Sequence, residues 1–100
     1  MEVSVTHHID CSELRQDGLY DWYYEYHLFR FTEEPMTFVV RSYVDSTDEA
    51  HFLGLENGRK TRSLSPGDLE LPLFQQAVHY LRESGKFSIT WLSDCGYKPI

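Results

Sequence analysis

The sequence predicts an α+β fold. We expect a single domain over residues 1–100, in which one helix from the C-terminal half packs on one face of an antiparallel sheet of about five or six strands. Apolar and polar residues alternate through much of the chain before Leu64, Asn57-Gly58 separates two such segments, and an amphipathic helical pattern follows Pro72. Single domains most often contain about 100–150 residues, so this chain has the length of one.

The composition is acidic, with sixteen Asp and Glu against nine Lys and Arg and a net charge of −7. Such a surface repels phosphate backbones, so we expect no nucleic-acid partner, whereas a cationic partner would be attracted. Hydrophobic residues make up 41% and aromatic residues 15%, which is typical of a chain that folds without a metal or a cofactor. We therefore expect neither a metal nor a cofactor.

The N-terminal residues lack the basic segment and apolar run of a signal peptide, and no segment approaches the roughly 18 apolar residues of a membrane span. We therefore expect a soluble, cytoplasmic protein without a membrane partner. Cys11 and Cys95 are the only cysteines, and in a reducing compartment both are expected to be free thiols.

The first two strands are predicted from alternation and from aromatic content. Val3 and Val5 alternate with polar residues, so residues 2–9 form the first strand, and residues 10–19 form a loop or a short helical turn. Residues 20–31 then hold seven of the fifteen aromatic residues. Aromatic side chains favour the pleated surface of a sheet, which indicates a strand with rings on both faces.

A third strand, residues 36–45, is predicted to pair with the aromatic strand after a turn at residues 32–35. We expect Arg30 to lie opposite Met36. This register places Leu28 opposite Phe38, Tyr26 opposite Val40 and Trp22 opposite Val44 on the core side. On the other side it pairs Glu25 with Arg41 and Tyr23 with Tyr43, which is favourable for charge and for aromatic contact.

A second hairpin is predicted at residues 50–64. Asn57-Gly58 favours a type I′ turn, which would set Glu56 opposite Arg59. The helix that follows has Pro72 in its first turn and ends at Ser84-Gly85. Its apolar face and the last strand are defined by two sets of side chains: Leu73, Phe74, Ala77, Val78 and Leu81 on the helix, and Phe87, Ile89 and Trp91 on the strand.

The sheet face opposite the helix is the predicted binding site, because dense exposed rings usually mark an interface. Its binding residues are expected to be Tyr23, Glu25, His27, Phe29, Val39, Arg41 and Tyr43. We interpret the protein as an interaction module that either forms a homodimer or binds a basic protein, as an acidic inhibitor or immunity-type protein would.

Two other functions are consistent with the sequence. A pocket between sheet and helix, walled by Trp22, Tyr24, Tyr26 and Trp91, would bind a flat or cationic small molecule. Glu25, His27, Arg41 and Tyr43 could perform acid–base chemistry, but they could equally form a cross-strand ladder, and no catalytic motif accompanies them. Residues 7–11, His-His-Ile-Asp-Cys, contain metal-ligand types without metal-site spacing. We therefore favour binding over catalysis and predict no metal site.

Overall fold

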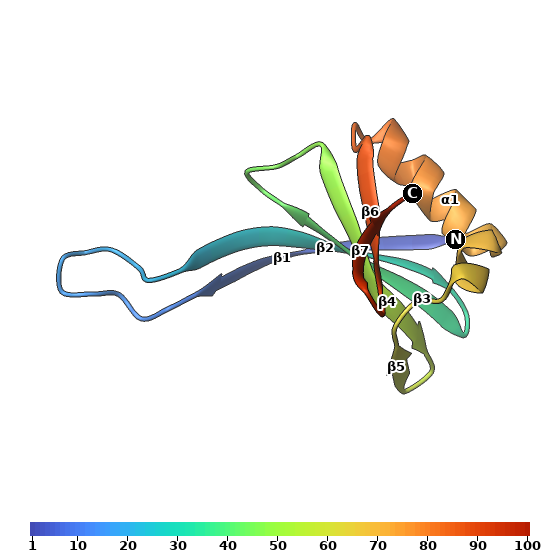
Figure 1. Ribbon diagram of the computed structural model, residues 1–100, viewed down its shortest axis with the longest axis horizontal. Helices are drawn as coiled ribbons and strands as arrows, with labels where there is room; N and C mark the ends of the chain where they lie inside the picture. Colours follow the sequence, from blue (N-terminus) through green and yellow to red (C-terminus); the bar gives the residue numbers. More distant parts are fainter.

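The computed structural model describes all 100 residues and confirms the α+β fold, with seven strands and one α-helix (Figure 1). In chain order the elements are β1 (Glu2–Cys11), β2 (Tyr23–Glu33), β3 (Met36–Tyr43), β4 (Glu49–Asn57), β5 (Lys60–Arg62), a 3₁₀ helix η1 (Pro66–Glu70), α1 (Pro72–Glu83), β6 (Ser88–Ser93) and β7 (Gly96–Pro99).

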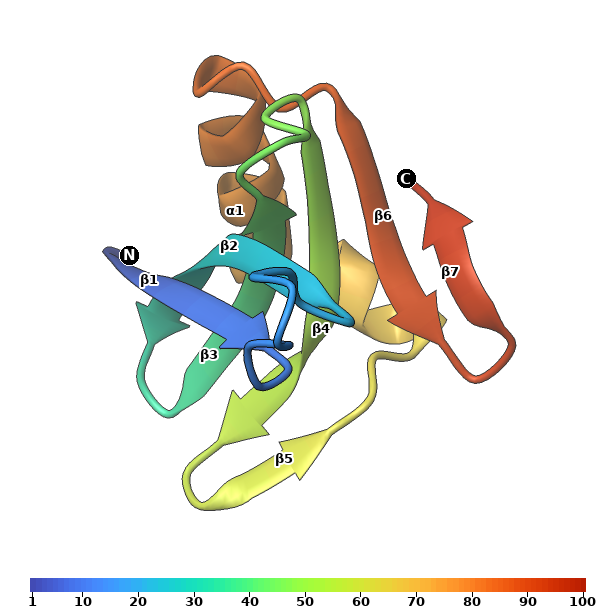
Figure 2. The same cartoon turned by 90° about the vertical axis from the view of Figure 1, so that its left-hand side faces the viewer.

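The strands form one sheet in the order β1-β2-β3-β4-β6-β7, with α1 behind it in Figure 2. One edge of β4 is shared. Its first half pairs with β6 and its second half with the short β5. The β4–β6 pair is the one parallel pair, because the chain crosses from β4 to β6 through α1 instead of through a hairpin. The predicted sheet was entirely antiparallel.

The core lies between the sheet and α1. Fourteen buried residues form it, and they include every residue of the predicted helix face. The ring of Phe74 packs against Phe52 and Phe38, with ring centroids 4.4 Å and 5.4 Å away. Burial of each such side chain stabilises the fold by about 1.5–3 kcal/mol. Phe38, Val40, Phe74, Val78 and Ile89 are core residues as predicted.

The ends of α1 also follow the prediction. Pro72 occupies the first helical turn. At the other end, Lys86 N–H donates to Leu81 C=O at 2.9 Å and Gly85 N–H donates to Arg82 C=O at 3.0 Å, which together form a Schellman motif. Gly85 has a φ of +90°, a conformation that glycine adopts without steric cost.

The predicted register of the β2–β3 hairpin is wrong. Glu33 pairs with Met36, because both strands continue to a two-residue turn at Glu34-Pro35, where the prediction had a longer loop. Phe31 therefore lies opposite Phe38 and Phe29 opposite Val40. This pairing collects four large apolar side chains on the helix face, whereas the predicted register would have left Phe29 and Phe31 outside the core.

The shift is odd, so each residue of β2 moves to the other face from the one predicted. Tyr26 lies opposite Tyr43, and Leu28 lies opposite Arg41 on the open face instead of in the core. Trp22 is 50% exposed. Val44 N–H donates to Glu25 C=O at 3.0 Å, which places Glu25 and Arg41 on opposite faces of the sheet.

The second hairpin exists, but its turn is displaced by one residue. Gly58 and Arg59 form the turn, Asn57 pairs with Lys60, and Glu56 pairs with Thr61 instead of Arg59. Gly58 has a φ of +64° and no other residue type has a positive φ. A type I′ turn needs a positive φ at both central residues, so that prediction is wrong.

Near the C-terminus, Ile89 and Trp91 are buried in β6 as predicted, but Phe87 precedes the strand and is 75% exposed. The strand β7 was not predicted.

Cys11 and Cys95 are exposed free thiols. The single α-helix is too short and too polar to cross a lipid bilayer.

Candidate functional site: the projecting arm and the aromatic face

The first hairpin is longer than the sheet that supports it. β2 extends over eleven residues, but β3 pairs with it only from Tyr26 to Glu33. Residues 9–25, which we call the arm, therefore continue as a two-stranded ribbon and a loop that stand clear of the body (Figure 1). The arm contributes to a longest dimension of 49 Å, against 30 Å and 28 Å for the other two.

The arm carries an unusual share of exposed apolar surface. Half of the fourteen exposed large hydrophobic side chains of the protein lie in it: Ile9, Leu14, Leu19, Tyr20, Trp22, Tyr23 and Tyr24. None of the fourteen core residues does. Packing inside this chain therefore does not account for these rings, and a concentrated exposed apolar surface is a mark of an interaction site.

Polar contacts hold the arm together in place of a core. His7 Nε2 and Glu25 Oε2 are 2.5 Å apart across the base of the ribbon. The backbone N–H of Asp21 donates to Ser12 Oγ at 2.8 Å, while Arg15 forms ion pairs with Asp17 and Asp21 at 3.0 Å and 3.5 Å. Exposed ion pairs of this kind contribute about 0–1 kcal/mol each, so the arm is weakly stabilised.

The arm is also acidic. It contains five carboxylates and a single basic residue, Arg15, for a net charge of −4 out of −7 for the whole protein. The carboxylates are those of Asp10, Glu13, Asp17, Asp21 and Glu25. Exposed rings and negative charge are therefore combined on one projection.

The open face of the sheet carries a second feature, a row of rings contributed by five of the strands. We call these residues the aromatic row: His8, Tyr26, Tyr43, His51 and Tyr97. Successive ring centroids are 5.5, 6.1, 6.4 and 5.4 Å apart. These distances are within the range of favourable aromatic contacts.

Arg41 lies against the aromatic row. Its guanidinium carbon is 4.9 Å from the ring centroid of Tyr43 and 5.9 Å from that of Tyr26, and its Nη2 donates to the Tyr97 hydroxyl at 3.0 Å. Its Nε is buried and has no hydrogen-bond partner. A cation over two tyrosine faces is a cation–π arrangement, so these rings already hold one positive group.

His51 is a partly buried member of the aromatic row. Nδ1 of its ring lies 2.6 Å from Thr90 Oγ1. Burial lowers the pKa of His51, and the nearby charge of Arg41 acts in the same direction, while Glu49 partly opposes it. The imidazole is therefore neutral at pH 7, which favours a hydrogen-bonding role over a charged one.

The predicted binding residues do not form one site. Val39, Arg41 and Tyr43 lie on the open face, but Val39 is only 9% exposed. The other four lie on the face that carries α1 or on its continuation into the arm: Tyr23, Glu25, His27 and Phe29. The proposed acid–base group is thereby divided, with Glu25 and His27 on one face and Arg41 and Tyr43 on the other.

The four residues predicted to line a pocket between sheet and helix do not lie together. Trp91 is 6% exposed inside the core, whereas Trp22 and Tyr24 are 50% and 52% exposed on the arm. Tyr26 belongs to the aromatic row. No group of three or more His, Cys, Asp or Glu side chains is close enough to hold a metal ion.

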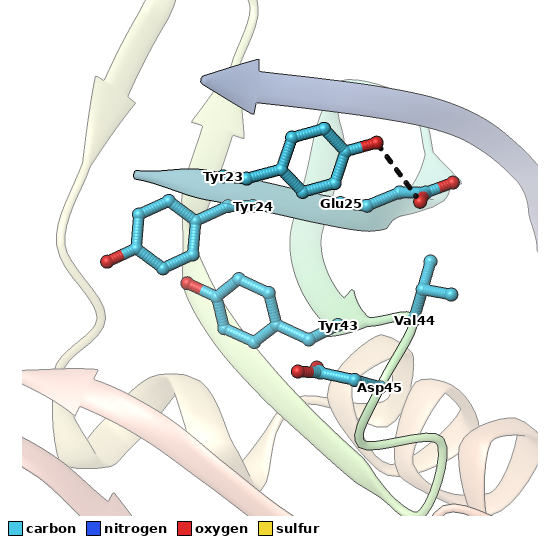
Figure 3. Close-up of a pocket in the computed structure, with 6 residues that line it drawn as sticks. All are labelled: Tyr23, Tyr24, Glu25, Tyr43, Val44 and Asp45. Carbon is cyan, nitrogen blue, oxygen red and sulfur yellow. Dashed lines mark hydrogen bonds between the residues drawn. The ribbon is translucent and has the colours of Figure 1, made fainter. Parts of the chain in front are cut away.

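A pocket does exist at the base of the arm, where β2 continues past the end of β3. The cavity has a volume of about 180 Å³ and six lining residues: Tyr23, Tyr24, Glu25, Tyr43, Val44 and Asp45. Figure 3 shows the three tyrosine rings with the Asp45 side chain close to Tyr43. Three of the predicted binding residues therefore meet here, around the free edge of β2.

Sequence reasoning missed His8, His51 and Tyr97 as members of one surface. The β1–β2 and β3–β4 pairings bring in His8 and His51, and the pairing of β4 with β6 and of β6 with β7 adds Tyr97. A scan against family models, a search of curated proteins and a search of solved structures each find no match for this chain.

Proposed function

We propose that this protein is an interaction module that binds a basic protein partner through the arm. The observation that carries the proposal is the concentration of seven exposed large hydrophobic side chains on a segment with no core of its own. Protein interfaces are enriched in aromatic residues at their centre, and Tyr and Trp supply much of their binding energy.

The stability of the arm supports the same function. A two-stranded hairpin without further packing is at best marginally stable in water. Contact with a partner would cover the rings of Tyr20, Trp22 and Tyr23 and would replace the core that the arm lacks. A projecting hairpin can also enter a concave site on another protein.

Charge selects the kind of partner. The arm has a net charge of −4, so two copies brought arm to arm would repel each other, whereas a basic surface would be attracted. We therefore favour a basic heterologous partner over a homodimer. The cytoplasm remains the proposed compartment, with two exposed free thiols as support.

Site-specific photocrosslinking in the cells that naturally make the protein tests this function. A photoreactive phenylalanine replaces Tyr20 on the arm, and in the matched control it replaces Phe87, which is 75% exposed and lies outside the arm. We expect the arm position alone to crosslink a protein with a basic isoelectric point.

The crosslinked protein is then purified and its affinity measured directly. Tyr20→Ser with Trp22→Ser should weaken binding by about thirtyfold or more, because loss of buried aromatic anchors costs about 2 kcal/mol or more. Phe87→Ser should leave the affinity unchanged. Crosslinking only to a second copy, to an acidic protein, or equally from both positions would contradict the proposal.

A further inference from the structure

We propose that the pocket at the base of the arm binds a cationic nitrogen group, an ammonium or a guanidinium, between the rings of Tyr24 and Tyr43 and the carboxylate of Asp45. In the complex, the group would come from a Lys or Arg side chain of the partner. This source rests on the proposed function, whereas the binding of a cation by the pocket does not.

The lining of the pocket has the composition of a cation site. Three tyrosine rings and two carboxylates line it, and no Lys, Arg or His does. Aromatic faces attract cations, and an ammonium between several rings is a recurrent form of recognition. The volume of about 180 Å³ is smaller than the roughly 300–1,000 Å³ of sites for drug-sized ligands, which suits the end of one side chain.

The two carboxylates differ in how far they are already engaged. Glu25 contacts His7 at 2.5 Å and accepts a hydrogen bond from the Tyr23 hydroxyl at 3.5 Å. Asp45 forms no hydrogen bond and no ion pair through its side chain, although it lies beside an aromatic wall. Asp45 is therefore the carboxylate that a bound cation would pair with first.

The tyrosines are suited to a cation in their neutral form. Desolvation and, next in importance, the charge of Glu25 raise the pKa of Tyr23, so its phenol remains protonated at pH 7. Arg41 already shows that the Tyr43 ring accepts a guanidinium, at 4.9 Å from its centroid. Arg41 itself does not line the pocket.

The geometry of the chain explains why the pocket is open. β3 ends at Tyr43, and the hydrogen bond from Val44 N–H to Glu25 C=O is the last link between the two segments. Beyond it, the edge of β2 at Tyr23 and Tyr24 has no neighbouring strand. A partner side chain can reach the pocket along this edge while the partner contacts the arm.

An NMR titration of the full chain with small probes tests the pocket. Tetramethylammonium, Nα-acetyl-lysine amide and Nα-acetyl-arginine amide are added separately, with tert-butanol and Nα-acetyl-norleucine amide as neutral controls. We expect saturable shifts of the Tyr24 and Tyr43 ring signals with at least one cation, at roughly millimolar affinity, and none with the neutral compounds. Equal shifts with neutral probes, or no shifts, would overturn the inference.

Matched variants locate the charge that matters. Asp45→Asn should weaken cation binding by about fivefold or more, because it removes the unpaired carboxylate and leaves the exposed loop intact. Glu70→Gln removes one charge from an exposed position outside the pocket and should have no effect. An equal effect of both variants would show that the net charge of the protein attracts the cation without a specific pocket, and it would contradict the inference.

The source of the cation is tested separately with the purified partner. If Asp45→Asn weakens the complex by a similar factor, a partner side chain occupies the pocket. If it weakens only the binding of small probes, the proposed source is wrong and the pocket takes a free amine. Loss of partner binding in the arm variants without any cation binding would overturn the pocket while leaving the proposed function in place.

Discussion

Arg62 donates two hydrogen bonds to Asp68, from Nη1 to Oδ2 and from Nη2 to Oδ1, each 2.7 Å long. The pair joins β5 to the short helix before α1. Ser65 donates to the same carboxylate from its backbone N–H at 2.8 Å and from its hydroxyl at 3.1 Å. These hydrogen bonds, the one from Arg62 first, lower the pKa of Asp68 to about 2 from an ordinary 3.8.

The stability of the fold at low pH should depend on the Arg62–Asp68 pair. Because the folded pKa of Asp68 lies below its unfolded value, its contribution is present above pH 3.8 and is lost as the pH falls through about 2. The contribution is at most about 2 kcal/mol, since water reaches the half-exposed Arg62. Urea unfolding of Asp68→Asn should show a loss of roughly 1–2 kcal/mol at pH 7 that disappears near pH 2. Asp94→Asn, at an exposed turn, serves as the control.

The burial of His51 should also make the stability of the fold depend on pH. Its folded pKa is lowered, so protonation favours the unfolded state, and stability should fall as the pH drops below the ordinary value of 6.5. His51→Gln should remove this part of the pH profile. Titration of the His51 ring by NMR should give a midpoint below 6.5, while a midpoint above 6.5 would show that burial does not lower the pKa of His51.

Gly54 tests the close approach of β5 to β4. A Cβ at this position would lie 3.0 Å from the backbone oxygen of Arg62. Gly54→Ala must therefore displace backbone, and we expect it to lower the free energy of unfolding by roughly 1–3 kcal/mol. Gly67 is the control, because a Cβ there meets nothing within 4 Å and Gly67→Ala should change stability little. Equal effects of the two substitutions would show that steric crowding is not the cause.

The parts of the fold that depend on local chemistry could be predicted from the sequence. The helix follows from the spacing of Leu73 to Leu81, with Pro72 at its start and Gly85 after its end. These signals act within a few residues and need no knowledge of the rest of the chain. The same holds for the buried positions Ile89 and Trp91 in β6.

The register of the β2–β3 hairpin could not be predicted because it depends on the length of the turn between the strands. Ending the strands at Arg30 and Met36 instead of Glu33 and Met36 moves the pairing by three positions, which exchanges the two faces. The parallel pairing of β4 with β6 and the addition of β7 depend on contacts distant in sequence. The strands β6 and β7 are both short, and Pro99 ends β7.

The same limit applies to the site. The sequence indicated that the segment from Tyr20 to Phe31 is a strand with rings on both faces, but it assigned Trp22 to the core, and Trp22 is 50% exposed. It could not show that β3 stops at Tyr43 while β2 continues, which is what exposes both the arm and the pocket. Glu25 was expected beside Arg41, and the odd shift in register instead places it beside His7.

The tip of the arm, residues 12–22, should be dispensable for folding. Cys11 lies directly opposite Tyr23, so residues 12–22 can be replaced by the two-residue turn Asn-Gly without a change of register. No core residue lies in the removed segment, and a shorter loop costs less closure entropy. Urea unfolding of the shortened protein should therefore give a free energy within about 1 kcal/mol of the full chain.

The shortened protein separates the two proposed binding surfaces. It retains Tyr23, Tyr24 and the other residues that line the pocket, so binding of tetramethylammonium should persist. It lacks Leu14, Leu19, Tyr20 and Trp22, so binding of the basic partner should be weakened by more than thirtyfold. A shortened protein that unfolds, or that binds the partner as tightly as the full chain, would show that the arm serves the fold and not recognition.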